Sequence, residues 1–100
     1  MIARRWTGRV PADRFGAYLE ILDRTGLQHY AATPGHRGTT VLSRAADGVT
    51  EIEITTLWES EDAIRAFAGD DIGLAVYYPE DEGYLLDFPE RVEHWEVVER

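Results

Sequence analysis

The chain has 100 residues, of which 44% are hydrophobic, and 10 basic against 19 acidic residues give it a net charge of −9. It contains neither cysteine nor lysine, which excludes disulfides, thiolate metal sites, iron–sulfur clusters, Schiff bases and a P-loop. The acidic balance argues against nucleic acid or an anionic membrane as partner, because both require a basic surface.

The length predicts one domain over residues 1–100, since domains usually have about 100–150 residues. A domain of this size gains from covering further surface with a second copy, which weakly favours an oligomer. No apolar run approaches the ~20 residues of a membrane span, and the start MIARRWTG lacks a signal-peptide core. We therefore expect a cytoplasmic protein without a membrane partner.

Residues 2–9 have strand character, with Gly8 expected as a bulge or a close-packing point. Arg4 and Arg5 then point to opposite faces. The inward one is a candidate anion anchor. The alternative, which we prefer at this stage, is that both lie at the surface or at the rim of a dimer.

Pro11 suits the start of a helix, and Gly26 is expected as its left-handed cap. The apolar side chains between them recur at helical spacing: Phe15, Tyr18, Leu19 and Leu22. A further helical turn over residues 27–30 and a type II turn at residues 33–35 are predicted before the next strand.

Residues 38–45 and a strand starting at Thr50 flank Asp47-Gly48, a strong hairpin signal. Ser60 is placed to cap a helix that ends near Gly69. Trp58, between strand and helix, is a candidate pocket wall, with core packing as the alternative.

Residues 72–78 are expected to form a short helix that Pro79 ends, with Asp70 or Asp71 as its cap. The acidic run 80–82 is expected to be a solvated loop, and residues 84–88 an apolar patch buried against another element. The alternation over residues 91–99 predicts a last strand containing His94 and Trp95.

This order, β-α-β-β-α-β, predicts an α+β fold of the ferredoxin-like type, an antiparallel sheet with two helices on one face. The other face is expected to carry Thr, Ser, Trp and His side chains. Such a mixture favours a second sheet packed on it, which would enclose a cavity between two protomers.

Three tracts, LWESEDAIRAFAG (57–69), YYPEDEGYLLDF (77–88) and VEHWEV (92–97), resemble the antibiotic-biosynthesis-monooxygenase-like family of dimeric α/β barrels. The resemblance covers the whole chain and implies a homodimer with facing sheets. Some members of that family oxygenate polycyclic phenols without flavin or metal, some degrade heme, and many have no established activity.

The heme-degrading branch is marked by a Trp in the second long helix, a His ten positions later, and an Asn on the first strand. The matching positions here hold Phe67, Tyr77 and Thr7. A tyrosine can ligate heme iron, but the three departures argue against heme degradation.

The first hypothesis is therefore a monooxygenase that needs no cofactor and acts on, or binds, a small aromatic or quinone-like metabolite. His94 is the candidate base and Tyr77 the second candidate catalytic residue. Four aromatic residues are candidate ligand contacts: Trp6, Trp58, Phe67 and Tyr78. The competing interpretation is that all six are structural.

The sequence leaves open whether the protein is an enzyme. The main alternative is a non-catalytic dimer that binds a small molecule or is purely structural, and heme binding through Tyr77 is the third possibility. A cavity below roughly 100 Å³ would favour the non-catalytic dimer, because ligand sites usually have ~300–1,000 Å³.

Overall fold

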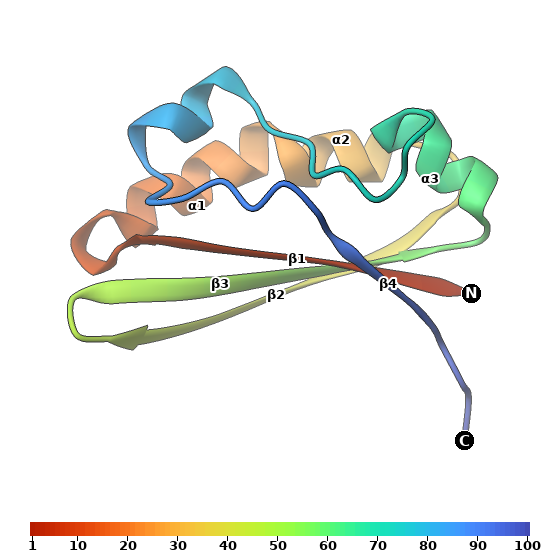
Figure 1. Cartoon of the computed structure of the whole chain (residues 1–100), viewed down its shortest axis with the longest axis horizontal. Coiled ribbons are helices and arrows are strands. Elements are labelled where there is room, and N and C mark those ends of the chain that lie inside the picture. The colour runs from red at the N-terminus through yellow and green to blue at the C-terminus, as the bar shows by residue number, and fades with distance from the viewer.

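Four strands form one antiparallel sheet in the order β2-β3-β1-β4 in the computed structural model, which describes residues 1–100 (Figure 1). The strands are β1 (Ile2–Pro11), β2 (His36–Ala46), β3 (Val49–Trp58) and β4 (Glu93–Glu96). The helices are α1 (Phe15–Arg24), α2 (Gly26–Ala32) and α3 (Glu61–Ala68), with the short 3-10 helices η1 (Ala12–Arg14) and η2 (Pro79–Gly83). The predicted ferredoxin-like α+β fold is confirmed.

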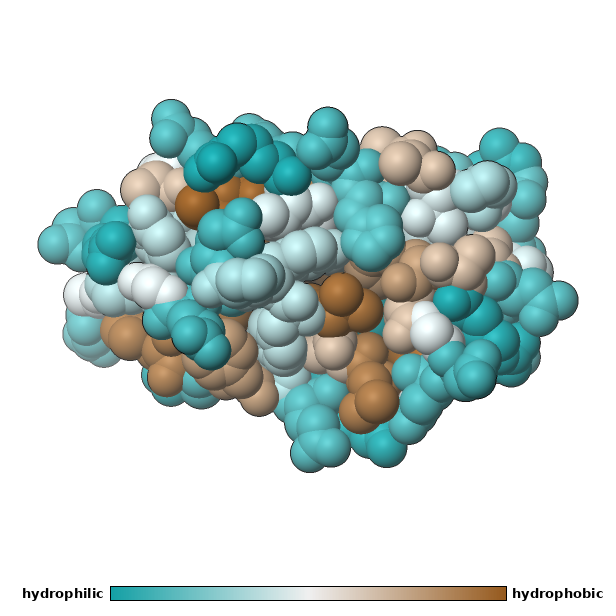
Figure 2. All heavy atoms as spheres, turned by 90° about the horizontal axis from the view of Figure 1, so that it is seen from above, coloured by the Kyte–Doolittle hydropathy of each residue, from teal (hydrophilic) through white to brown (hydrophobic).

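All helices lie on one face of the sheet, and the other face carries no element of this chain (Figure 1). The C-terminal residues leave β4 and project away on this uncovered side. Seen from the helix side, the surface is mainly hydrophilic with separate apolar patches (Figure 2). None of the helices has both the length and the apolar character needed to span a membrane.

One hydrophobic core fills the space between sheet and helices. The even-numbered residues of β1 and β3 point into it, because side chains alternate along a strand and these strands pair without a bulge. From the sheet come Trp6, Val10, Ile52, Ile54 and Trp58. From the helices come Tyr18, Ile21, Leu22, Tyr30, Ile64 and Phe67.

The local signals for the hairpin and for α3 are confirmed. Asp47 and Gly48 both have positive φ (55° and 77°), as a two-residue type I′ turn requires. The Ser60 side chain accepts a hydrogen bond of 3.2 Å from the backbone N–H of Ala63, and Gly69 ends the helix at φ 92°.

The expectation that Gly26 caps the first helix is wrong, since Gly26 is the first residue of α2. The break between the helices falls at Thr25, whose hydroxyl donates to the Ile21 carbonyl at 2.8 Å. A Cβ on Gly26 would lie 3.3 Å from the Tyr30 hydroxyl, so this glycine permits close packing within α2.

Residues 72–78 form no helix, contrary to the prediction. Their backbone pairs with the returning chain: the Ala75 N–H donates to the Glu90 carbonyl and the Val92 N–H to the Gly73 carbonyl, both at 2.9 Å. This antiparallel contact satisfies backbone groups that a helix would otherwise pair internally. It also uses residues that were assigned to the last strand, and β4 is reduced to four residues.

The acidic run is not a solvated loop, because Asp81 in η2 is only 3% exposed. Its carboxylate accepts hydrogen bonds from the Tyr18 hydroxyl at 3.0 Å and from the Tyr78 N–H at 2.8 Å. Burial and the neighbouring Asp81 raise the pKa of Tyr18, so its hydroxyl stays protonated and remains a donor. This contact joins η2 to α1.

The expected burial of the apolar patch at residues 84–88 is only partly observed. Leu85 is buried, whereas Leu86 and Phe88 are each nearly half exposed.

The composition expected for the uncovered sheet face is also partly wrong. Trp6, Trp58 and His94 point to the helices, as their strand positions show. The uncovered face instead carries threonines, paired arginines and glutamates, Leu42 and Trp95.

Gly8→Ala should destabilise the protein by about 1–3 kcal/mol, because a Cβ at this position would lie 2.2 Å from the Trp6 ring. Urea denaturation followed by circular dichroism measures the change. Gly16→Ala is the matched control: no atom lies within 4 Å of its added Cβ, and alanine is favoured in a helix by up to about 1 kcal/mol. Equal effects of the two substitutions would contradict the packing described here.

Tyr18→Phe should lower the free energy of unfolding by about 1–3 kcal/mol, because it leaves one oxygen of the buried Asp81 carboxylate without a donor. Tyr84→Phe removes the same hydroxyl from the ring that packs beside Tyr18, at a centroid distance of 5.7 Å. The Tyr84 hydroxyl makes no hydrogen bond within the chain, so this variant should unfold within about 0.5 kcal/mol of wild type.

Candidate functional site

A small hollow lies between the helix-facing side of the sheet and the segments that cover it. Its volume is about 20 Å³, enough for roughly one water molecule. Eight of its eleven lining residues are hydrophobic. The lining consists of Arg4, Trp6, Tyr18, Leu22, Gly26, Tyr30, Ile54, Val76, Tyr77, Tyr78 and Asp81.

Arg4 is the cation of this site. It shares the buried face of β1 with Trp6 and Val10 and is only 4% exposed. Its Nη2 donates to the Leu74 carbonyl at 2.7 Å, and its guanidinium carbon lies 5.4 Å from the centre of the Phe67 ring. Its Nε is buried and has no hydrogen-bond partner. The expectation that both early arginines lie at the surface is therefore wrong for Arg4.

No carboxylate forms a salt bridge with Arg4. Burial lowers the pKa of this guanidinium, while the phenols of Tyr30 and Tyr78 oppose that shift. Arginine nevertheless keeps its charge in proteins. The hollow therefore contains a buried positive charge bordered mainly by aromatic rings.

The two neighbouring tyrosines differ in how their hydroxyls are used. The Tyr77 hydroxyl accepts from the Trp6 indole N–H at 3.2 Å and donates to the Pro89 carbonyl. The Tyr78 hydroxyl lies 2.6 Å from Nδ1 of His29, a surface-side partner. The Tyr77 hydroxyl proton is thus already used in a hydrogen bond within the chain. The Tyr78 hydroxyl could bind a ligand by giving up a single contact, the one to His29.

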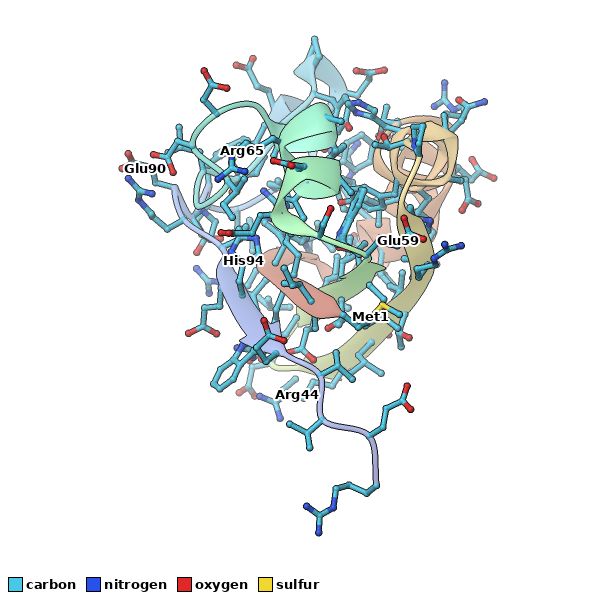
Figure 3. The ribbon with its side chains drawn as sticks, turned by 90° about the vertical axis from the view of Figure 1, so that its right-hand side faces the viewer. Met1, Arg44, Glu59, Arg65, Glu90 and His94 are labelled. Carbon is cyan, nitrogen blue, oxygen red and sulfur yellow. The ribbon has the colours of Figure 1, made fainter.

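His94 lies directly opposite Arg4 in the β1–β4 pairing and points to the same side of the sheet. Figure 3 shows it on the flank of the molecule, where β4 begins beneath α3. Its Nε2 is buried without a partner. Burial, followed by the positive charge of Arg4, lowers the His94 pKa, although Glu61 opposes this. His94 is therefore neutral at pH 7, as a proton acceptor must be.

The aromatic residues that the sequence proposed as ligand contacts fall into two groups. Trp6 and Tyr78 border the hollow. Trp58 is fully buried, donates from its indole N–H to the Thr56 hydroxyl at 2.8 Å, and stacks on Phe67 at 5.7 Å. Trp58 and Phe67 do not line the hollow, and their contacts support the core role that the sequence left open.

Of the eleven lining residues, sequence reasoning proposed only Trp6, Tyr77 and Tyr78. Among the polar residues that it missed are Arg4, Tyr30 and Asp81. Asp81 had a usable signal, since an acid three positions after Tyr78, with Pro79 between them, is the pattern of a capped helical turn. Arg4 also had a sequence signal, because it lies an even number of positions from Trp6 and Val10 and therefore shares their face of the strand. Tyr30 had none, because its burial depends on how α2 packs against the sheet.

A larger hollow, of about 510 Å³, lies on the uncovered face of the sheet. Only two of its twelve lining residues are hydrophobic, and its arginines are paired with acids. Arg44 binds Glu51 at 2.9 Å and Arg9 binds Asp87 at 3.0 Å, while Arg5 bridges Glu53 and Glu93. Figure 3 shows Arg44 on the side of the sheet away from the helices.

The comparisons with known proteins identify the fold. No protein-family model matches the sequence, and no curated protein does. A solved structure described as a putative antibiotic biosynthesis monooxygenase from Bacillus cereus matches 99% of this chain and 95% of its own, with a TM-score of 0.63 and 17% identity.

A mutant of MhuD, solved with two manganese protoporphyrin IX molecules bound per active site, matches all of this chain and 97% of its own, with a TM-score of 0.58 and 23% identity. Coverage is nearly complete in both directions, so the similarity concerns the whole domain. The resemblance inferred from the three sequence tracts is thus confirmed at the level of structure: this chain has the antibiotic-biosynthesis-monooxygenase-like fold.

Proposed function

We propose that this protein binds a small, flat aromatic or quinone-like metabolite between the sheet and the helices, and oxygenates it without a flavin or metal. The observation that carries the proposal is the pair of Arg4 and His94, adjacent on the helix-facing side of the sheet. Arg4 lines the aromatic hollow, and His94 lies next to Arg4, outside that lining. A neutral base and a buried cation are what the formation of a carbanion or phenolate requires. The monooxygenase-like fold supports the same chemistry by analogy.

In the proposed reaction, His94 takes a proton from an acidic carbon or hydroxyl of the substrate. The resulting electron-rich anion transfers electrons to molecular oxygen. With an anthrone, one oxygen atom becomes the new carbonyl and the other leaves as water with the two hydrogens of the methylene group. The protein contributes the base, donors for the developing charge and exclusion of water.

The hollow must enlarge, and extend past Arg4 to His94, to admit such a substrate, because it now holds about one water molecule and His94 lies outside its lining. The side chains of Val76, Tyr77 and Tyr78 form part of its wall and belong to a segment with no regular secondary structure. Two side-chain contacts hold that wall, Tyr77 to the Pro89 carbonyl and Tyr78 to His29. We propose that substrate hydroxyl or carbonyl groups replace these contacts.

A second candidate is a non-catalytic dimer, which the size of the hollow favours. A volume of about 20 Å³ is far below the ~300–1,000 Å³ usual for ligand sites. The heme alternative does not fit the residues present. The Tyr77 hydroxyl, its proposed iron ligand, is held by Trp6 and Pro89, and Thr7, the residue at the expected Asn position, is exposed on the opposite face of β1.

We further propose that a second copy of the chain packs on the uncovered sheet face. Leu42 and Trp95 are 53% and 58% exposed there, which is unusual for large apolar residues of a sheet. The charged groups of this face are already paired within the chain, so covering them leaves no unmatched charge at its centre. The partners expected for this protein are thus a second copy and a small aromatic ligand.

His94→Gln should abolish oxygen uptake with a panel of hydroxylated anthrones, whereas His36→Gln, the same change at the start of β2, should retain it. For wild type, the rate should rise with pH through the His94 pKa, which burial places below the usual 6.5, because only the neutral imidazole accepts a proton. An oxygen electrode measures both results. Uptake that persists in the His94 variant, with an unchanged pH profile, would contradict the assignment of the base.

Leu42→Glu should convert a dimer into monomers in sedimentation velocity, because it replaces an exposed apolar side chain of the uncovered face with a carboxylate that would be buried without a partner between the two sheets. Ala17→Glu adds the same charge to the exposed side of α1 and should leave the dimer intact. Wild-type protein that sediments as a monomer at micromolar concentration would rule out this arrangement.

A further inference from the structure

We propose that the molecule bound in this hollow is an anion, and that Arg4 pairs with its charge. The class is a flat aromatic body that carries an ionised phenol, an enolate or a carboxylate. This inference rests on the proposed function, because it concerns the same hollow. It specifies the charge of the ligand and names Arg4 as the residue that recognises this charge. The fold determines neither.

Arg4 differs from the nine other arginines of the chain, because it is buried and has no carboxylate partner. Three of the nine are exposed and also form no salt bridge: Arg14, Arg24 and Arg100. The other six form salt bridges with carboxylates of the chain: Arg5, Arg9, Arg37, Arg44, Arg65 and Arg91. All six are on the surface or on the uncovered sheet face, where water already stabilises the charge. Arg4 is 4% exposed and pairs with none of the 19 acidic residues. The chain thus leaves unpaired the one arginine that most needs a counter-charge.

No carboxylate of the chain lies within salt-bridge distance of Arg4. Asp81 borders the same hollow, but its two oxygens accept from the Tyr18 hydroxyl and the Tyr78 N–H. These bonds fix the carboxylate at the end of η2, where it caps the turn. In the proposed complex, the ligand therefore supplies the counter-charge for Arg4.

Arg4 also retains one donor without a partner. The Nη2 of Arg4 is bound to the Leu74 carbonyl, while its Nε–H is buried without a partner. Tyr30 and Tyr78 line the same hollow and interact electrostatically with the guanidinium. An oxyanion bound at the guanidinium would accept from Nε, and the Trp6 ring lines the hollow, where it can contact an aromatic body.

Charge selection also has a chemical consequence for the proposed reaction. A cation next to a bound phenol or enol favours its ionised form, in which the substrate is rich enough in electrons to reduce oxygen. Arg4 would then stabilise the anion that forms when the neutral His94 beside it accepts the proton. A neutral hydrogen-bond donor in place of Arg4 would bind the substrate but favour ionisation much less.

The test uses two probes of equal shape, 2-naphthoate and 2-naphthamide, in calorimetric titrations of the intact protein. Wild type should bind the carboxylate at least about tenfold more tightly than the amide, since a hydrogen bond to a charged group contributes about 1.5–3 kcal/mol. Arg4→Met should lose this preference, and Arg65→Met, which removes a surface charge on α3, should keep it. The preference should persist at ~1 M sodium chloride, because buried pairs are screened little.

Thermal unfolding without ligand provides the second measurement. Arg4→Met keeps most of the aliphatic stem and removes an unpaired buried charge, so its Tm should be equal to or a few degrees above that of wild type. A large drop in Tm would show instead that Arg4 serves the fold, and would overturn the inference.

The remaining outcomes separate this inference from the proposed function. Equal binding of the two probes, unaffected by Arg4→Met, overturns the anion site and leaves the aromatic site standing. Failure of both probes at millimolar concentration overturns the anion site as well. Oxygen uptake with uncharged anthrones then decides the proposed function separately.

Discussion

The hydrogen bond from the Arg4 guanidinium to the Leu74 carbonyl connects the centre of the sheet to the segment that covers it. Residues 74–78 run past Arg4 without regular secondary structure, and backbone pairing with the returning chain at residues 90–92 holds this segment in place. The position of β4, and with it the placement of His94 beside Arg4, follows from this path. The floor and the wall of the hollow are thus joined by one buried, charged residue.

Charged side chains are paired on one face of the sheet and unpaired on the other. On the uncovered face, arginines and acids pair across neighbouring strands, so the face is polar and carries little unmatched charge. On the helix-facing side, one arginine is buried among aromatic rings and bound to a neutral carbonyl. Pairs at a surface contribute little to stability, whereas an isolated buried charge is costly. Buried charges without a partner in the chain are common at functional sites, where a ligand supplies the missing counter-charge.

The two structural neighbours share the fold of this chain and are described in different terms. One is described as an antibiotic biosynthesis monooxygenase, and the other holds manganese porphyrins in its active site. The backbone arrangement is common to both, so what distinguishes this chain is the side chains that face the helices. A buried arginine next to a neutral histidine suits an anionic intermediate. The hydroxyl of Tyr77, tied to Trp6 and Pro89, does not suit metal ligation.

The sequence by itself determined the element order, the Asp47-Gly48 hairpin, the Ser60 cap and the alternation of Ile52 and Ile54, because these depend on turn chemistry and on contacts a few residues apart. It also named His94, Tyr78 and Trp6. The tertiary structure decided which of the two early arginines is buried, that the Asp81 carboxylate is enclosed against α1, and that residues 72–78 are not helical. These outcomes depend on pairings between segments about 15 to 70 residues apart, which local propensity does not encode.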